Sequence, residues 1–288
     1  MSTSRSRRAR LRIALPSVSL PALALAAALA GCGNQETSPP EQGDRPTTPA
    51  AAPGTPEALL DQAAEWWGGR EALAAEKGFS IEGTVTVLPA GGGDAIELSV
   101  EVIARHQPYS YRERQFVSRE DSLTGEVMAT NEIIKIVNGT RAWSTDLTTG
   151  KISPDIALAT NIGKQPTPRK ILLFREHHLT LEDRGEEPIG ELGGMQAHRL
   201  LATAPDGSFV WVYVDLQGRL RKLSFQDSSR GVWIAVVFES YRDPEQLGGM
   251  AVTESVAYYR GNELVSRFTW GKRDPAPELT EEIFLPPQ

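Results

Sequence analysis

The sequence has little that could support covalent cross-links or metal chemistry. One cysteine, Cys32, occurs in 288 residues, so an internal disulfide is excluded. Of the four histidines, His177 and His178 are adjacent, with rings that point apart in a helix or strand, and His106 and His198 are isolated. The chain also lacks the spacings of HExxH zinc sites, GxSxG nucleophile elbows, phosphate-binding loops and EF-hands. We therefore predict no catalytic residue, no metal and no cofactor.

Long hydrophobic runs are also missing. Residues 13–30 are mostly apolar, but Pro16 and Pro21 interrupt them, and no sustained run of ~20 apolar residues could form a permanent transmembrane helix. The first 31 residues contain five arginines and no acidic residue. A basic start, a short apolar segment and small residues at its end are the parts of an export signal. Residues 1–31 are therefore predicted to be a signal peptide.

The signal ends in Leu29-Ala30-Gly31-Cys32, which resembles a bacterial lipobox. This resemblance implies cleavage between Gly31 and Cys32 and attachment of lipid to Cys32, which would anchor the protein to a membrane in the cell envelope. Gly33 follows the anchor where aspartate would favour the inner membrane, so the sorting rule of some Gram-negative envelopes favours the periplasmic face of the outer membrane. Two alternatives are a plain secretory signal and a twin-arginine signal at residues 6–12, which lacks the usual aromatic residue.

Basic charge is scarce once the signal is removed. Loss of residues 1–31 takes away five arginines and leaves 25 basic and 37 acidic side chains, a formal net charge of −12. This charge repels nucleic acid and anionic lipid headgroups, so we predict neither as a partner. Residues 32–56 comprise the lipidated cysteine and a proline-rich segment with almost nothing to bury. We predict a disordered tether that spans roughly 25–30 Å as a flexible coil.

The sequence pattern of residues 57–288 predicts one α+β domain. A helical pattern begins at Pro56 and ends at Gly68-Gly69, and two more short helical patterns lie within residues 153–178. Eleven segments read as strands, at residues 78–88, 95–105, 109–118, 131–137, 141–146, 197–204, 208–215, 219–226, 232–242, 250–260 and 263–271. Short turns predict consecutive antiparallel strands in a single large sheet, curled into a half-open β-barrel of about 11 strands. The N-terminal helix and the inserted helical pair would cover its concave face, and acidic residues at alternating strand positions would face water.

Several strands are apolar on both faces, which an open antiparallel sheet does not require. In residues 208–215, one face carries Phe209, Trp211 and Tyr213, and the other carries three valines. Two interpretations fit this pattern: a core filled by the helices, or an apolar cavity that holds a lipid-like ligand. For the second interpretation, the candidate ligand-binding residues are Trp143, Phe209, Trp211 and Tyr213.

The order of these motifs resembles the LolA/LolB-like lipoprotein-carrier domain family. The likeness covers roughly residues 56–287, with the stretches "EALLDQAAEWWGGREALAAEKGFSIEGTVTV", "VNGTRAWSTDLTTGK", "VYVDLQGRLRKLSF" and "FESYRDPEQLGGMAV" in family order and the ending "EEIFLPP". The resemblance implies a half-barrel of about eleven strands whose helices cover a concave apolar face. It also implies that the space between sheet and helices accepts acyl chains.

These observations lead to one preferred function and two alternatives. The preferred function is a membrane-anchored periplasmic lipoprotein that binds an acyl chain or lipid-like ligand, with a role in lipid or lipoprotein trafficking and no enzymatic activity. The first alternative is an envelope protein–protein adaptor or stress-sensing module without a ligand cavity. The second, an enzyme, would require several acids and a histidine to converge in one cleft. The sequence makes no prediction of oligomeric state.

Overall fold

The computed structural model describes the greater part of the chain after the predicted tether. The described residues are 54–89, 93–106, 109–120, 127–146, 149–158, 166–227, 231–242, 253–274 and 277–287. Gly31, Cys32 and nearly all of the tether lie outside them, so the signal, the lipid anchor and the domain boundaries remain predictions. No helix within the described ranges has the length and apolar character needed to cross a bilayer.

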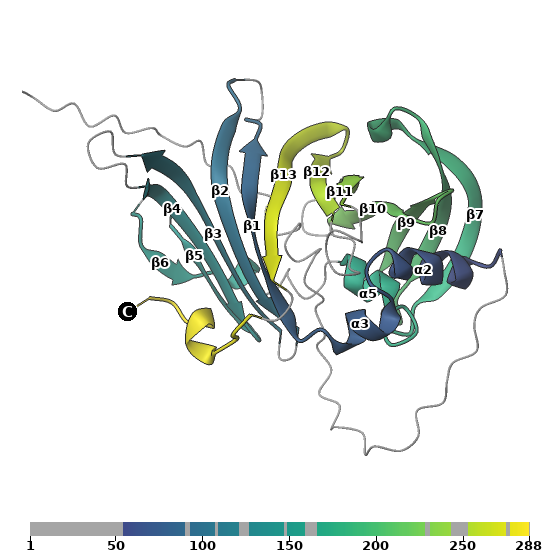
Figure 1. The fold of residues 1–288 in the computed structure, drawn as a ribbon, viewed down its shortest axis with the longest axis horizontal. Helices are drawn as coiled ribbons and strands as arrows, with labels where there is room; N and C mark the ends of the chain where they lie inside the picture. Colours follow the sequence, from purple (N-terminus) through teal and green to yellow (C-terminus); the bar gives the residue numbers. More distant parts are fainter. Residues whose placement is uncertain are drawn as a thin grey trace, which may run out of the picture.

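The domain is built on one sheet of thirteen strands (Figure 1). The strands are β1 (Gly78–Val87), β2 (Ile96–Arg105), β3 (Ser110–Glu120), β4 (Val127–Asn138), β5 (Arg141–Thr145), β6 (Ile152–Pro154), β7 (Thr180–Ile189), β8 (Met195–Thr203), β9 (Phe209–Asp215), β10 (Leu220–Asp227), β11 (Val232–Tyr241), β12 (Thr253–Arg260) and β13 (Glu263–Asp274). Their spatial order is β6-β5-β4-β3-β2-β1-β13-β12-β11-β10-β9-β8-β7, and all neighbours are antiparallel.

The pairing of β1 with β13 joins the two ends of the domain. Val85 lies opposite Phe268 and Gly83 lies opposite Trp270 in this pair. A Cβ at Gly83 would lie 2.3 Å from the backbone oxygen of Thr269, so only glycine allows this close approach. Because β1 and β13 are central, β6 and β7 become the two edges of the sheet. These strands are consecutive in sequence, so the connection between them, which includes α5 (Pro168–Leu172), has to pass from one edge to the other.

The first helices form where the sequence predicts them. In α2 (Pro56–Glu65), the hydroxyl of Thr55 accepts a hydrogen bond from the Ala58 amide, and Pro56 occupies the first turn. Gly68 and Gly69 have φ angles of 91° and 86°, which a side chain would strain, and they separate α2 from α3 (Arg70–Ala75). The contacts of α2 with α5, β7 and β9 place these helices over one half of the curled sheet (Figure 1).

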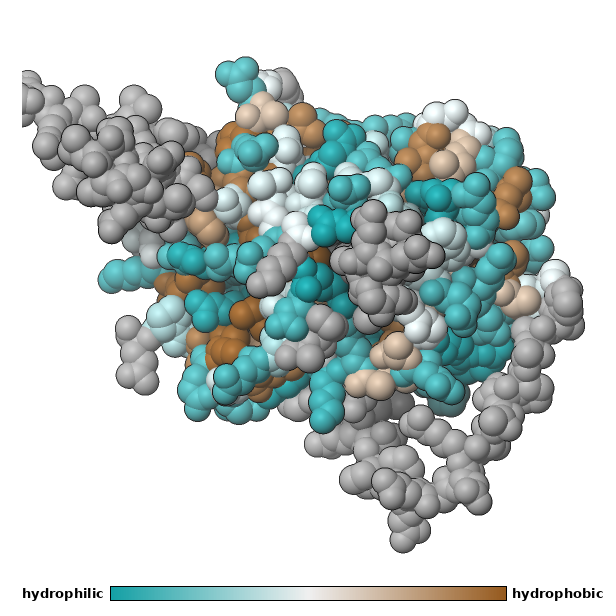
Figure 2. Space-filling view, viewed as in Figure 1, coloured by the Kyte–Doolittle hydropathy of each residue, from teal (hydrophilic) through white to brown (hydrophobic). Residues whose placement is uncertain are grey.

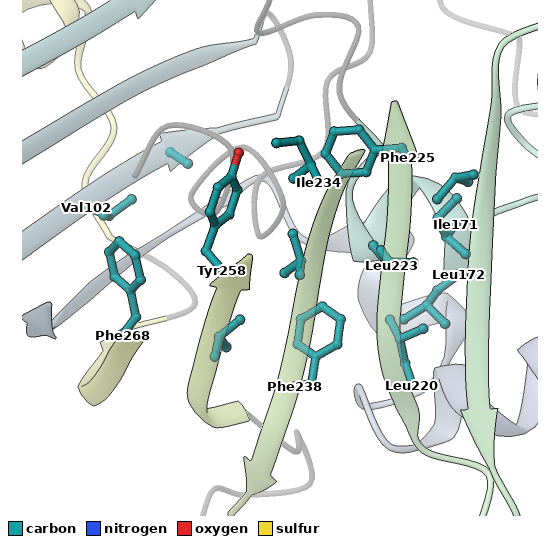
Figure 3. Close-up of a cluster of buried hydrophobic side chains, with 14 of the residues drawn as sticks. Val102, Ile171, Leu172, Leu220, Leu223, Phe225, Ile234, Phe238, Tyr258 and Phe268 are labelled. Carbon is teal, nitrogen blue, oxygen red and sulfur yellow. The ribbon is translucent and has the colours of Figure 1, made fainter. Parts of the chain in front are cut away.

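The main core lies between the sheet and the helices. Alternate residues of the two-sided strand β9, Val210, Val212 and Val214, belong to it. Leu60 and Ala63 of α2 and Ile171 and Leu172 of α5 pack in the same core and are almost fully buried. Figure 3 shows Leu220, Leu223, Phe238, Tyr258 and Phe268 as part of this cluster, on successive strands. We call this the inner face of the sheet.

The opposite, outer face carries smaller apolar clusters under two 3₁₀ helices. Leu192 of η1 (Gly190–Leu192) packs with Trp211 and Tyr213 of β9 and with a second group on β11 and β12. Phe284 of η3 (Glu281–Phe284) is fully buried against Ile134 and Ile136. The two-sided apolar pattern of β9 is therefore explained by packing on both faces.

The structure confirms the predicted fold class, an α+β chain with one curled antiparallel sheet that does not close. All eleven predicted strands are present, and the two additional strands are the edges, β6 and β7. Strand β7 is mostly exposed and polar, and β6 has three residues, so neither has the apolar alternation that identifies a strand. Of the predicted helical pair, the second is α5, and the first runs into residues 159–165, outside the described residues.

Removal of the Phe284 side chain should detach the C-terminal segment from the outer face. Phe284→Ala should lower the free energy of unfolding by about 3 kcal/mol, because it leaves a cavity against β4. Leu285→Ala is the matched control, since Leu285 is 47% exposed and should change stability by less than about 0.5 kcal/mol. Urea unfolding of both variants measures the difference, and equal losses would contradict this packing.

Candidate functional site

The inner face of the β1–β4 half is an apolar wall. Val100 and Val102 of β2 and Val137 of β4 belong to the main core and are at most 1% exposed. In the described structure, the main contacts of α2 with strands are with β7 and β9, in the other half. Figure 2 shows hydrophobic residues gathered over the β1–β5 half of this view, whereas hydrophilic residues predominate over the half with α2.

A polar cluster interrupts this apolar wall. Tyr111, Glu113 and Gln115 alternate along β3, and Tyr111 is a member of the main core, so all three side chains point to the inner face. The partner of Glu113 on β4 is Lys135. We call these four residues the Glu113 cluster.

The carboxylate of Glu113 holds the cluster together. It accepts hydrogen bonds from the Tyr111 hydroxyl, from Gln115 Nε2 at 2.7 Å and from Lys135 Nζ at 3.0 Å. Glu113 is 1% exposed and Lys135 is 9% exposed, so both charges are buried and their pairing is needed to offset desolvation. Burial raises the pKa of the Tyr111 hydroxyl well above its ordinary value, and the charge of Glu113 raises it further. Tyr111 is thus a neutral donor, and the cluster has no net charge.

One polar atom of the cluster is left without a partner. Gln115 is fully buried, and its Oε1 accepts no hydrogen bond from any residue that the structure describes. Reversal of the amide would place its oxygen against the Glu113 carboxylate, so Glu113 fixes the orientation with the oxygen free. An unpaired buried acceptor costs about 1–3 kcal/mol. Within the described residues, no hydrogen bond to Oε1 offsets this cost.

A second buried polar cluster joins the helices to the sheet. Glu76, directly after α3, accepts a hydrogen bond from Arg273 of β13 and lies 3.3 Å from His106 Nε2, at the end of β2. Arg169 of α5 donates to the carbonyl oxygens of Leu73 and Ala74 at the end of α3. These contacts tie α3 and α5 to the ends of β2 and β13, so we assign them a structural role.

The side chains of this second cluster have shifted pKa values. Burial lowers the pKa of His106, and the positive charges of Arg169 and Arg273 lower it further despite the hydrogen bond with Glu76. Burial raises the pKa of Glu76, but the hydrogen bond with His106 and the charge of Arg273 outweigh it, and the net shift is downward. For His177, after α5, burial and nearby basic residues lower the pKa to about 4.

The four aromatic residues predicted to bind ligand lie on the outer face. Trp143 packs in the cluster under Phe284. The rings of Phe209 and Trp211 meet edge to face, with centroids 6.3 Å apart, and Tyr213 packs with Trp211 beneath η1. Trp143 thus lies in a different outer cluster from the three β9 residues, and all four are separated from the Glu113 cluster by the sheet. Their ligand-binding role remains a prediction.

The Glu113 cluster itself is not apparent from the sequence. Acidic residues at alternating strand positions are predicted to face water, and for Glu113 this prediction is wrong, because Lys135, Tyr111 and Gln115 compensate its burial. The available signal is that Tyr111, Glu113 and Gln115 occupy every second position of the strand and therefore share one face. The pairing with Lys135 depends on strand register. In the described ranges, no three histidine, cysteine or acidic residues are grouped in a way that could hold a metal ion.

The arrangement defines a class of fold: a curled antiparallel sheet with short helices over part of its inner face. Among the solved structures similar to this chain are a LolA superfamily protein from Nitrosomonas europaea and a DUF1329 family protein from Desulfovibrio piger. Each is 12% identical to this chain, with a TM-score of 0.49, and the match covers 80% of this chain and 96% of the other. A proposed outer membrane lipoprotein-sorting protein domain from Vibrio parahaemolyticus matches with a TM-score of 0.47, 12% identity and coverage of 78% and 97%.

These similarities concern the fold alone. No family model and no curated protein sequence matches the chain.

The shifted histidines predict that the domain loses stability in acid. The pKa values of His106 and His177 in the folded chain lie below the ordinary 6.5, so the folded state binds fewer protons than the unfolded state. Their contribution is complete above pH 6.5 and is lost as the pH falls, for His177 down to about 4. The lowered pKa of Glu76 adds a further loss below 4.5.

Urea unfolding between pH 7 and pH 4 measures this dependence. We expect the free energy of unfolding to fall with pH, and His106→Gln and His177→Gln should each reduce the slope. His198→Gln, on β8, is the matched control. A free energy of unfolding that stays constant from pH 7 to pH 4, or an equal effect of the control, would contradict the assignment.

Proposed function

We propose that the chain is a lipid-anchored protein of the cell envelope whose domain binds an acyl chain or lipid-like ligand against the inner face of β1–β4. The observation that supports this most directly is the fully buried Oε1 of Gln115 within an apolar wall, which has no hydrogen-bond partner among the described residues. An apolar wall alone is explained by core packing. An unpaired acceptor inside it is explained by a ligand that is mostly apolar and has one polar group.

The energetics require a long apolar chain. Each CH₂ group that leaves water contributes ~0.8 kcal/mol, so ten methylenes contribute about 8 kcal/mol. Association costs roughly 4–15 kcal/mol in lost freedom. For a short-chain molecule, the free energy of burial against this wall is too small to offset the cost of association. The expected ligand therefore has a chain of ten or more carbons. Binding of this kind needs no covalent chemistry, and we propose no enzymatic activity.

The predicted anchor and tether fit such a role. A lipid on Cys32 would hold the domain near a membrane, and residues 33–56 would allow it to move roughly 25–30 Å from the surface. The acidic net charge of the mature chain opposes flat contact with anionic headgroups. We place the protein at the periplasmic face of the outer membrane, where it would take part in lipid or lipoprotein trafficking.

A protein–protein adaptor is the second candidate, and the outer face favours it. Phe209 and Trp233 are large aromatic residues that remain 43% and 40% exposed, with ring centroids 6.2 Å apart. Exposed aromatic residues in contact are common at protein interfaces. This surface lies on the opposite side of the sheet from the Glu113 cluster, so both functions could belong to one domain.

Ligand binding predicts lipid in the purified protein and uptake of a fluorescent fatty acid. Val100→Phe should reduce uptake at least several-fold, because the larger ring occupies the inner wall of β2. Ser99→Phe adds the same ring to the outer face of β2 and should leave uptake unchanged. Mass spectrometry of extracts and fluorescence titration measure both, with thermal unfolding as a check of folding. Absence of co-purified lipid together with no uptake would refute the proposal.

The anchor makes a separate prediction. Cys32→Ala should abolish labelling with a radioactive fatty acid and prevent cleavage at Gly31, while the domain still folds, because its described core begins after the tether. Membrane fractionation of cells that express both forms shows the result. If the alanine form is still labelled and still sediments with membranes, the lipobox interpretation is wrong.

A further inference from the structure

The Glu113 cluster has a specific pattern of available donors and acceptors. Oε1 of Gln115 is an acceptor without a partner in the described structure. Lys135 carries three ammonium hydrogens, and its one described hydrogen bond goes to Glu113. The site therefore offers an acceptor on β3 and a donor group on the adjacent strand β4, both in a wall of valine side chains.

We propose that this cluster selects lipids whose polar end is uncharged and donates a hydrogen bond, such as a fatty amide or a long-chain alcohol or monoacylglycerol. The inference rests on the proposed function, because it concerns the polar end of the same ligand. An N–H or O–H group of the ligand would donate to Gln115 Oε1, and its oxygen would accept from Lys135 Nζ.

The charges of the cluster weaken the binding of the most common alternative, a fatty acid anion, relative to a neutral lipid of the same chain length. A carboxylate has only acceptors, so it cannot satisfy Gln115 Oε1. It would also add a second negative charge beside the buried carboxylate of Glu113, and it would compete with Glu113 for the single cation, Lys135. Arg112 and Arg114 alternate with Glu113 along β3, so both lie on the opposite face of the sheet and do not add positive charge to the cluster. On that face, Arg114 pairs with Glu101 and Glu132.

The hydrogen-bond pattern also weakens the binding of neutral lipids that have no donor. A methyl ester has the same chain and no charge, but it has no hydrogen for Gln115 Oε1. The amide, the ester and the acid of one 18-carbon chain therefore form a matched series in which the polar end alone changes. The amide can make one hydrogen bond to a buried group that the ester cannot make, so the amide should bind about tenfold more tightly than the ester.

The test is titration of the full chain, freed of bound lipid, with each member of this series. Displacement of 1-N-phenylnaphthylamine reports binding, and calorimetry at pH 7.5 confirms it. We expect the amide to bind most tightly, followed by the ester and then the acid. Monoacylglycerol with the same chain should bind like the amide, since it also supplies a donor.

Two variants assign the selectivity to the cluster. Gln115→Met keeps the size of the side chain and removes Oε1, so the amide and the ester should bind equally. Gln226→Met, at an exposed position on β10, is the matched control and should retain the preference. Glu113→Gln leaves Lys135 as the only charge and should reverse the order, with the acid bound most tightly.

The possible outcomes separate this inference from the proposed function. If the probe and all three lipids fail to bind, the proposed function itself is refuted. If all three bind with equal affinity, or the acid binds most tightly to the unaltered protein, the domain binds lipid but the selectivity inference is overturned. If Glu113→Gln does not fold, Gln115→Met still decides the question, because loss of the amide preference in this variant is required and its persistence would contradict the assignment.

Discussion

The pairing between the first and the last strand determines the architecture. Because β1 pairs with β13, two runs of antiparallel strands become one sheet, and its edges fall between the consecutive strands β6 and β7. The chain must then travel from edge to edge, and the segment that makes this passage contains α5, whose Ile171 and Leu172 are buried in the main core. The helical cover of the inner face follows from the topology. The close approach of the backbones at Gly83 allows β1 to pair with β13. Both the continuous sheet and the position of the helices over it depend on this pairing.

The same sheet separates two kinds of surface. On the outer face, η1 and η3 supply the side chains that cover the apolar residues of β9 and β4. On the inner face, the β7–β9 half contacts α2, whereas the β2–β4 half contains the Glu113 cluster. A buried ion pair is weak evidence for stability, because its desolvation offsets most of the attraction. Oε1 of Gln115, which has no partner in the described part of the chain, adds a further cost, and for this reason we propose a binding role for the cluster.

The sequence predicts the fold well because the fold depends on local periodicity. Period-two patterns identify the eleven inner strands, and Gly68-Gly69 identifies the end of α2. The sequence does not predict the edge strands β6 and β7, because exposed strands have no apolar face to produce the pattern. The candidate site cannot be predicted from the sequence for a different reason. Glu113 and Lys135 are 22 residues apart, and only the register of β3 and β4 brings them together. The aromatic side chains of β9 favour Phe209 and Trp211 as ligand-binding residues. Side-chain alternation alone, however, does not show which face of a strand lies under the helices.

The central claim is that lipid occupies the inner face of β2–β4, and methyl NMR with a spin-labelled lipid tests it most directly. A nitroxide on the acyl chain broadens the signals of nearby methyl groups. We expect stronger broadening for the inner-face methyls of Val100, Val102 and Val137 than for those of Ile103, Ile134 and Ile136 on the outer face of the same strands. Broadening of the outer isoleucines with unchanged inner valines would contradict it.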